Sequence, residues 1–315
     1  MSGAQVESLL NSAKRYFGFN ADVEITLEAN PGTLDSAQLV DYRLAGVNRL
    51  SVGVQSFENE QLRWLGRRHS SSQAVQVVEM ARSAGFNRIS LDLMFSLPQQ
   101  SLTSLKSQCQ LLRQLAPEHL SVYGLTVEEQ TPFAAQHADG LWQLPDDELY
   151  REMFMLVHEQ LGDQGFEHYE ISNYAQPGER CRHNMTYWQR RPYLGVGAGA
   201  HSFFTSTDSV GWGERWACEN SIENYIQALE SGDSPRQLCE VFTKQHAMAE
   251  TVYLALRCRD GVDLTQFAAT FDQTFQSVYS TAMERCSHHL TTTSQRSSLD
   301  VEGWLLYNYL IENFL

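Results

Sequence analysis

Four polar or ionisable side chains lie within, or directly after, segments whose apolar patterns predict β-strands. These side chains and their predicted strands are Glu28 (residues 23–27), Gln55 (49–55), Asp92 (88–95) and Tyr123 (119–125). The carboxyl ends of parallel strands meet at one edge of a sheet, where ligands bind in α/β proteins. Buried carboxyl and amide groups need hydrogen-bond partners, and a ligand with amine, hydroxyl and carboxylate groups supplies them. The pattern therefore predicts a polar ligand site at this edge.

Three of these residues also have a purely structural interpretation. Asp92 could cap a helix, Gln55 could bond to the backbone, and Glu28 could pair with Arg49 or Arg67. For any one residue the structural interpretation is the more common case. Polar groups at four successive strand ends favour the ligand site.

Residues 181–188 bring a thiol, an imidazole and two large aromatic rings together in polar surroundings. Histidine or cysteine can ligate haem iron, and aromatic rings can stack on a planar macrocycle. The alternative is a hydrogen-bonded loop anchored by its aromatic rings, and composition alone favours it, because a lone histidine is rarely a ligand. The glycine-rich residues 195–200 match a nucleotide-binding loop only weakly, so they predict close backbone packing.

The elements that position these groups alternate between strand and helix in the first part of the chain. Helices are predicted at residues 35–44, 59–65, 71–83, 101–115 and 145–161, and a fifth strand at 166–171. Such strand–helix units predict an α/β fold with a parallel sheet, and apolar strands indicate a sheet covered on both faces.

The rest of the chain changes character after an irregular stretch at residues 172–191. Helices are predicted at 222–230, 247–257 and 271–288, with no strong strands between them. A short strand or wing at 299–302 and a closing helix at 304–315 follow. The boundary is predicted near residues 205–220. The chain would then divide into residues 1–212 and 213–315.

Composition limits the class of protein. The chain has 23 Lys and Arg against 38 Asp and Glu, a net charge of −15, which repels phosphate backbones, so no nucleic-acid partner is expected. No apolar run approaches the roughly 18 residues that cross a bilayer, and the N-terminus lacks a signal-peptide pattern, so a cytoplasmic protein is expected. The six cysteines lie at least 19 positions apart. Neither a disulfide framework nor a local zinc or iron–sulfur motif is therefore predicted.

A series of ordered motifs extends over essentially the whole chain. They are LEANPGTL, GVNRLSVGVQSF, LGRRH, AGFNRISLDLMFSLPQQS, PEHLSVYGLTVEEQTPF, YEISNYAQPGERCRHNMTYW, YLGVGAGAHSF and LRCRDGVDL. In these motifs the chain resembles the HemN/HemW branch of the radical S-adenosylmethionine (SAM) proteins. The resemblance implies a partial parallel (β/α) barrel followed by a mainly helical HemN-type C-terminal domain.

The resemblance also implies roles for particular residues. Glu28 would contact SAM, and Gln55, Arg67 and Asp92 would line a second SAM-type site or whatever replaces it. The run His183, Asn184, Tyr187 and Trp188 matches an HNxxYW signature that marks the HemW side of the branch. The signature shifts the interpretation of His183 towards haem contact, with its imidazole as a ligand of the haem iron.

The departures from the family pattern concern its beginning. The family's C-x3-C-x2-C segment, which holds a four-iron four-sulfur cluster, and its Gly-Gly-Gly-Thr-Pro motif are both missing from this sequence. We therefore expect no radical chemistry from this chain, and we expect a barrel without its first two strands that opens on the following helix. An incomplete gene product and a genuine truncation are the two explanations. The exposed sheet edge that a truncation would leave favours incompleteness. Ser96 also stands where the family usually has glycine.

Three functions follow from the resemblance. The first is a HemW-type haem chaperone that delivers haem to acceptor proteins, including peripheral contact with membrane haem proteins. The alternative is an oxygen-independent coproporphyrinogen III oxidase, a radical SAM enzyme of porphyrin metabolism. The third is a non-catalytic remnant that binds a tetrapyrrole or a protein partner.

Overall fold

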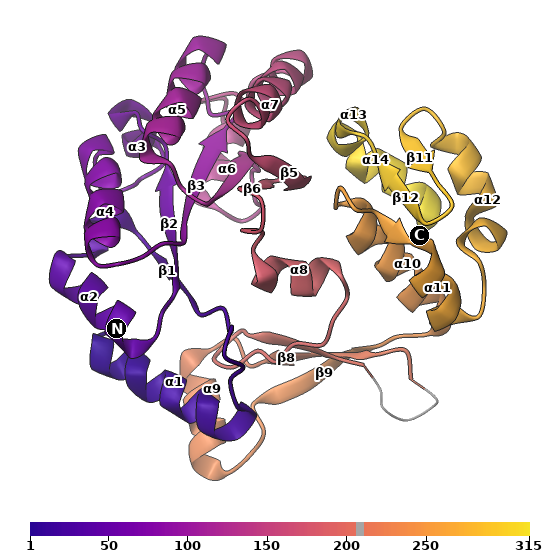
Figure 1. Cartoon of the computed structure of the whole chain (residues 1–315), viewed down its shortest axis with the longest axis horizontal. Coiled ribbons are helices and arrows are strands. Elements are labelled where there is room, and N and C mark those ends of the chain that lie inside the picture. Colours follow the sequence, from indigo (N-terminus) through magenta and orange to yellow (C-terminus); the bar gives the residue numbers. More distant parts are fainter. Residues whose placement is uncertain (206–210) are drawn as a thin grey trace. The chain divides into compact units, whose positions relative to one another are not determined.

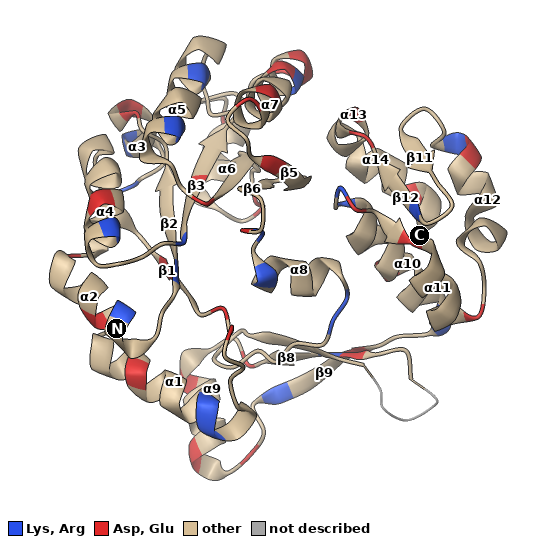
Figure 2. Ribbon diagram, viewed as in Figure 1, with Lys and Arg blue, Asp and Glu red and all other residues tan. Residues whose placement is uncertain are grey.

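The computed structural model describes residues 1–205 and 211–315. They form two compact units, Met1–Cys181 and Arg182–Leu315. The division predicted between residues 212 and 213 stays a prediction. Charged residues are scattered over the helices of both units (Figure 2).

The first unit is built on a six-stranded sheet with the order β1-β2-β3-β4-β6-β5. Its strands are β1 (Thr26–Ala29), β2 (Arg49–Gln55), β3 (Ile89–Phe95), β4 (His119–Gly124), β5 (Glu167–Glu170) and β6 (Asn173–Ala175). Strands β1 to β4 are parallel, as predicted, whereas β6 is antiparallel to both β4 and β5. The carboxyl ends of the four parallel strands therefore lie at one edge.

Helices connect the strands of this unit. They are α1 (Gly3–Phe17), the 3-10 helix η1 (Pro31–Thr33), α2 (Ser36–Ala45), α3 (Asn59–Trp64), α4 (Ser71–Ser83), α5 (Leu102–Leu115), α6 (Pro132–Ala138) and α7 (Asp147–Gly162). Helix α2 has the predicted ends: the Asp35 side chain accepts from the Gln38 N–H, and Gly46 stops the helix in the left-handed conformation. Figure 1 shows α2, α4, α5 and α7 along one side of the sheet, an arrangement that fits the predicted partial barrel.

Alternation along the strands gives the sheet one apolar and one polar face. Leu50, Val52 and Val54 of β2 are completely buried, as are Leu91 and Leu93 of β3. The intervening positions carry polar groups, among them the buried Arg49 and Ser90. Burial of an aliphatic side chain contributes roughly 1.5–3 kcal/mol, so the apolar face holds the helices to the sheet. The opposite face is left to polar side chains.

Two elements occupy the stretch that was predicted to be irregular. Strand β6 and helix α8 (Arg182–Trp188) both form there. Both elements are too short to show a recognisable apolar pattern in the sequence. Strand β6 has three residues, all buried, and helix α8 has seven. Pairing of β6 with its neighbours and the buried side chain of Met185 determine these elements.

Ser96 has a left-handed backbone, with φ of 58°, and is almost fully buried at the end of β3. A side chain in this conformation costs about 1–2 kcal/mol, while glycine costs about 0.5–1 kcal/mol in chain entropy. We expect Ser96→Gly to increase the free energy of unfolding by about 0.5–1 kcal/mol, measured by urea denaturation. Ser96→Ala is the control, because it removes the hydroxyl group and keeps the Cβ atom. A glycine variant no more stable than the alanine variant would contradict the strain argument.

The second unit combines two small sheets with helices. Its elements are α8, β7 (His201–Phe204), β8 (Glu214–Cys218), α9 (Ile222–Ser231), β9 (Arg236–Val241), α10 (Lys244–Leu256), β10 (Val262–Asp263), α11 (Leu264–Phe271), α12 (Phe275–Arg285), β11 (Leu290–Thr292), β12 (Arg296–Leu299), α13 (Val301–Leu305), α14 (Tyr307–Ile311) and the 3-10 helix η2 (Glu312–Phe314). The sheets have the orders β7-β8-β9 and β10-β12-β11. Helices dominate, as predicted.

This unit differs from the prediction in a strand and in a helix, and it agrees with the prediction in the glycine-rich segment. Strand β9 forms between two predicted helices, where no strong strand was expected, because it is largely exposed and has no apolar alternation to signal it. The helix predicted at residues 271–288 is interrupted, because Asp272 is left-handed and Thr274 caps a new helix. The glycine-rich segment packs closely, as predicted, since a Cβ atom on Gly195 would lie 2.1 Å from the His201 carbonyl oxygen.

Candidate functional site

A row of polar side chains crosses the polar face of the sheet. Ser51, Asp92, Ser121 and Asn173 come from four neighbouring strands, β2, β3, β4 and β6. The Ser51 hydroxyl donates to Asp92 Oδ1 over 3.4 Å, and the Ser121 hydroxyl donates to Asn173 Oδ1 over 2.7 Å. Asp92 therefore does not cap a helix. It lies in the sheet and receives hydrogen bonds from neighbouring strands.

The environment of Asp92 favours its protonated form. Burial, followed by the negative charge of Glu28, raises the pKa of Asp92 from 3.8 to about 7. The hydroxyl groups of Ser121 and Ser51 and the positive charge of Arg67 oppose this effect only in part. A cationic or hydrogen-bond-donating ligand would stabilise the ionised carboxylate. Asp92 is thus the strongest chemical indication of a ligand at this edge.

Gln55 ends β2 in a strained conformation. Its φ is 65°, in the left-handed region, and the pairing of β2 with β3 shifts register between Val52 and Gln55. The side chain turns back over Gly53, where a Cβ atom would lie 2.9 Å from Gln55 Nε2. The Tyr123 hydroxyl donates to Gln55 Oε1 over 2.8 Å, so Gln55 bonds a side chain rather than only backbone. Strain of this kind is characteristic of functional sites.

Glu28 and Arg67 complete the group of predicted strand-end residues. Glu28 lies one residue before the end of β1 with an exposed side chain, and its register partner on β2 is Ser51. Arg67 Nη1 lies 3.4 Å from Asn30 Oδ1, just after β1. The structure thus brings Glu28, Gln55, Arg67 and Asp92 to one edge of the sheet. Reasoning from the sequence missed Ser51 and Ser121, which could have been found by counting alternate positions along each strand.

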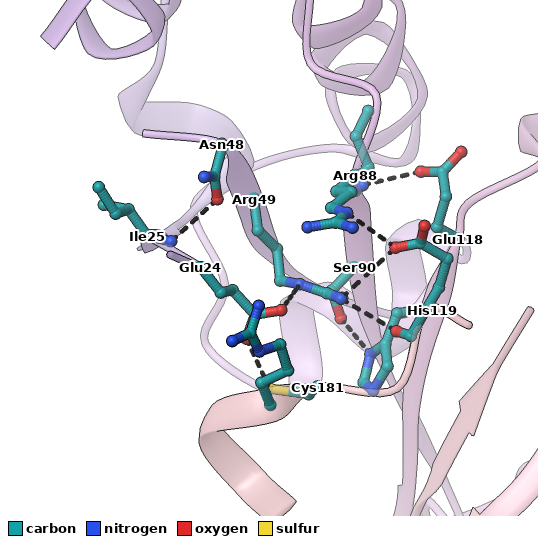
Figure 3. A network of polar contacts seen from close by, with 12 residues as sticks. Glu24, Ile25, Asn48, Arg49, Arg88, Ser90, Glu118, His119 and Cys181 are labelled. Carbon is teal, nitrogen blue, oxygen red and sulfur yellow. Dashed lines mark hydrogen bonds and ion pairs between the residues drawn. The ribbon is translucent and has the colours of Figure 1, made fainter. Parts of the chain in front are cut away.

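A buried ionic network lies further along the same face (Figure 3). Arg49, which is 2% exposed, places Nε 3.0 Å from Glu24 Oε2 and donates from Nη2 to the Glu179 carbonyl oxygen. Arg88 pairs with the Glu179 carboxylate at 3.0 Å. Arg49 therefore pairs with Glu24 rather than with Glu28. Its Nη1 is buried and has no hydrogen-bond partner among the described residues.

A histidine on β4 extends this network. His119 Nδ1 lies 2.7 Å from the Ser90 hydroxyl, and its Nε2 lies 2.8 Å from the Tyr169 hydroxyl. Burial, with a smaller contribution from the charge of Arg49, lowers the pKa of His119 to about 3. The imidazole is therefore neutral at physiological pH and acts as a hydrogen-bonding crosslink between strands.

The HNxxYW residues of the second unit lie on helix α8. His183 is exposed, and its ring packs edge to face against Tyr187 at 4.9 Å. Tyr187 in turn packs against Tyr193 at 4.5 Å. Asn184 and Trp188 are half-buried on the same helix, and the Arg257 guanidinium group lies 4.3 Å from the Trp188 ring centroid.

The residues of the HNxxYW signature lie on two different faces of helix α8. Residues four apart, such as His183 and Tyr187, share a face, whereas Met185 and Trp188 lie on another. Met185 and Trp188 both line a cavity of the second unit, and His183 and Tyr187 are not among its lining residues. The structure therefore separates the imidazole from the indole ring.

The cysteines of the described residues do not fit a four-iron cluster. Five are buried, at positions 109, 181, 218, 258 and 286, and Cys239 is exposed. Within residues 1–205 and 211–315, no group of three His, Cys, Asp or Glu side chains could hold a metal ion. A cluster needs several thiolates gathered around it. The thiols of the described residues are not gathered in the way that such a cluster requires.

Among the described residues, no helix combines the length and the apolar character that a membrane crossing requires.

Two segments of this chain match models of known domain families. Residues 3–110 match the family model of the radical SAM superfamily, and residues 242–306 match that of the HemN C-terminal domain. Coproporphyrinogen III oxidase (HemN) from Escherichia coli has a similar structure, with a TM-score of 0.81 over 100% of this chain and 74% of that chain. Because the sequence identity is 22%, this likeness shows the fold alone. The chain thus has a radical SAM-type barrel with a HemN-type C-terminal domain.

Several relatives of this chain are named heme chaperone HemW. The protein named heme chaperone HemW of Lactococcus lactis is 31% identical over 100% of this chain and 81% of its own length. The HemW protein of Bacillus subtilis is 33% identical over 100% of this chain and 82% of its own length. That of Escherichia coli is 41% identical over 66% of this chain and 54% of its own length. The chain belongs to the HemW family.

Proposed function

We propose that this chain is a haem chaperone, which binds haem and delivers it to acceptor proteins. The observation that carries the proposal is the HNxxYW helix α8, which presents the exposed imidazole of His183 beside Tyr187. A neutral imidazole is a common axial ligand of haem iron, and an adjacent aromatic ring can contact the macrocycle. Relatives named heme chaperone HemW, which align over the whole chain, support the proposal.

Titration with ferric haem tests this function. We expect the wild-type chain to shift the Soret band of haem, and His183→Ala to weaken binding at least tenfold, which is about 1.4 kcal/mol. His246→Ala is a suitable control, because His246 is an exposed histidine of the same unit outside the signature. Equal Soret shifts and affinities for the wild type and His183→Ala would remove His183 from the site.

We further propose that Glu28, Gln55, Arg67 and Asp92 contact SAM. SAM carries an ammonium group, a carboxylate and two ribose hydroxyls, which match the carboxylates, the amide and the guanidinium group of the strand ends. The raised pKa of Asp92 supports this fit, because a nearby ligand cation would favour its ionised form. When bound, SAM supplies a sulfonium group. The four strand-end residues would bind and orient SAM.

A protein that delivers haem needs acceptor proteins in the compartment where it works. We propose a cytoplasmic protein whose acceptors are haem proteins, without assigning a particular one. The net charge of −15 supports a role without nucleic acid, because an acidic surface repels phosphate groups.

A further inference from the structure

The second unit contains a cavity of about 450 Å³ between helices α8, α10 and α11 and the sheet β10-β12-β11. Its volume lies in the range of small-molecule sites, about 300–1,000 Å³. Four large apolar side chains line it: Met185 and Trp188 from α8, and Phe267 and Phe271 from α11. The two phenylalanine rings pack at 4.8 Å. A ligand with a flat apolar body would match these walls.

Cationic side chains accompany the aromatic walls of this cavity. Arg191 is exposed, and no side-chain ion pair is found for it among the described residues. Arg296 pairs with Asp263 at 3.2 Å, but both side chains are between a third and a half exposed. Such an exposed pair is weak, so a ligand carboxylate can compete for the guanidinium group. Asp260 is a second carboxylate of the lining, and it disfavours a ligand with more negative charge than the arginines can balance.

A third arginine of the lining is already occupied. Arg190 Nε lies 2.6 Å from Glu250 Oε2, and its Nη2 donates to the Trp212 carbonyl oxygen. Its guanidinium carbon also lies over the rings of Phe203 and Phe242, at 4.7 and 4.8 Å. Arg190 thus supports the wall of the cavity, and Arg191 and Arg296 remain as the groups that can recognise an anion.

The indole of Trp188 provides a polar group as well as an apolar surface. Its Nε1 is buried and has no hydrogen-bond partner among the described residues. A buried N–H without a partner is unfavourable, and a ligand oxygen that accepts from it would remove this cost. Arg257 stacks on the ring and fixes its orientation.

We infer that this cavity binds the macrocycle of a tetrapyrrole, with the propionate carboxylates at Arg191 and Arg296. The identity of the ligand rests on the haem chaperone function proposed above, whereas the apolar walls and the two arginines are independent of it. His183 is not among the lining residues. The cavity is therefore a tetrapyrrole site distinct from the haem contact proposed at His183.

Metal-free protoporphyrin IX tests the inference, because it has the macrocycle and both propionates but no iron. We expect Arg191→Gln combined with Arg296→Gln to weaken its binding about tenfold or more, because two charge-assisted contacts are lost. Thr270→Trp, which adds bulk at the rim on α11, should also weaken it. Arg285→Gln and Ala269→Trp are matched controls, since both residues are exposed and neither lines the cavity. Binding is measured by porphyrin fluorescence, and folding by circular dichroism.

The outcomes separate this inference from the proposed function. Loss of protoporphyrin binding in the cavity variants, with binding retained in His183→Ala and in both controls, supports the cavity. Equal binding by the wild type and the cavity variants overturns it, even if haem binding depends on His183. Absence of protoporphyrin binding by the wild type also overturns it. If protoporphyrin binding depends on the cavity but ferric haem is not bound, the chaperone proposal fails and the cavity stands.

Discussion

Asp92→Asn is expected to stabilise the protein at pH 8 by up to about 4 kcal/mol and to leave its stability at pH 4 nearly unchanged. The folded state raises the pKa of Asp92 from 3.8 to about 7, because burial and then Glu28 disfavour the ionised carboxylate. Between these values the folded state holds a proton that the unfolded state has released. The free energy of unfolding therefore falls as the pH rises, by about 1.4 kcal/mol per unit of pKa shift. Asparagine cannot ionise and avoids this cost.

Urea denaturation of both proteins between pH 4 and pH 8 measures this effect. The difference in stability should grow from pH 4 to pH 7 and then stay constant, because Asp92 is ionised in both states above that pH. Asp233→Asn, an exposed substitution, is the control and should change stability by less than about 0.5 kcal/mol at any pH. A difference that does not vary with pH would show that folding does not raise the pKa of Asp92.

The same substitution relates stability to ligand binding. If Asp92 contacts the cationic part of SAM, Asp92→Asn should weaken SAM binding while it stabilises the free protein. Such opposed effects are typical of residues retained for function at a cost in stability. Calorimetric titration of both proteins with SAM measures the binding change.

Arg49→Met is expected to destabilise the protein by about 3–5 kcal/mol, the usual cost of removing one partner from a buried ion pair. The substitution keeps most of the aliphatic volume but removes the charge that lies 3.0 Å from Glu24, whose side chain is 6% exposed. It also removes the donor to the Glu179 carbonyl oxygen. The loss should appear as a lower midpoint in urea denaturation with an unchanged slope.

Two further variants identify the cause of that loss. Adding Glu24→Gln to Arg49→Met should restore part of the stability, because it removes the buried charge that Arg49 had balanced. Arg63→Met, on the surface of α3, controls for the loss of an arginine and should change stability by no more than about 0.5 kcal/mol. An Arg49→Met variant within about 1 kcal/mol of the wild type would mean that the network contributes little net stability.

Local patterns predicted the elements with strong apolar alternation or clear caps. Strand β2 has the predicted bounds, and α2 begins after Asp35 and stops at Gly46 as expected. Short elements escaped prediction because their stability comes from neighbours distant in sequence: β6 pairs with β4 across about 50 residues, and α8 has only seven residues, of which Met185 is buried. The left-handed conformation of Ser96 was also not predictable, because the residue type does not favour it.

The sequence predicted which residues lie at the strand-end site but not which partners they bond. Glu28, Gln55 and Asp92 were recognisable because parallel strands place their carboxyl ends together. Their actual partners depend on register: Asp92 bonds Ser51, and Gln55 bonds Tyr123. A change of one residue in register would turn these side chains to the other face of the sheet.

The sequence by itself determined the α/β class, the strand-end residues, the HNxxYW signature and the family resemblance. These follow from residue types and short spacings, which local sterics and alternation translate directly into structure. Only the tertiary structure decided that Asp92 has a strongly raised pKa, and that His183 and Trp188 point to different surroundings of α8. It also formed the cavity lined by Trp188, Arg191 and Arg296. Burial and cavity shape depend on side chains that are far apart in the chain, so no local pattern contains them.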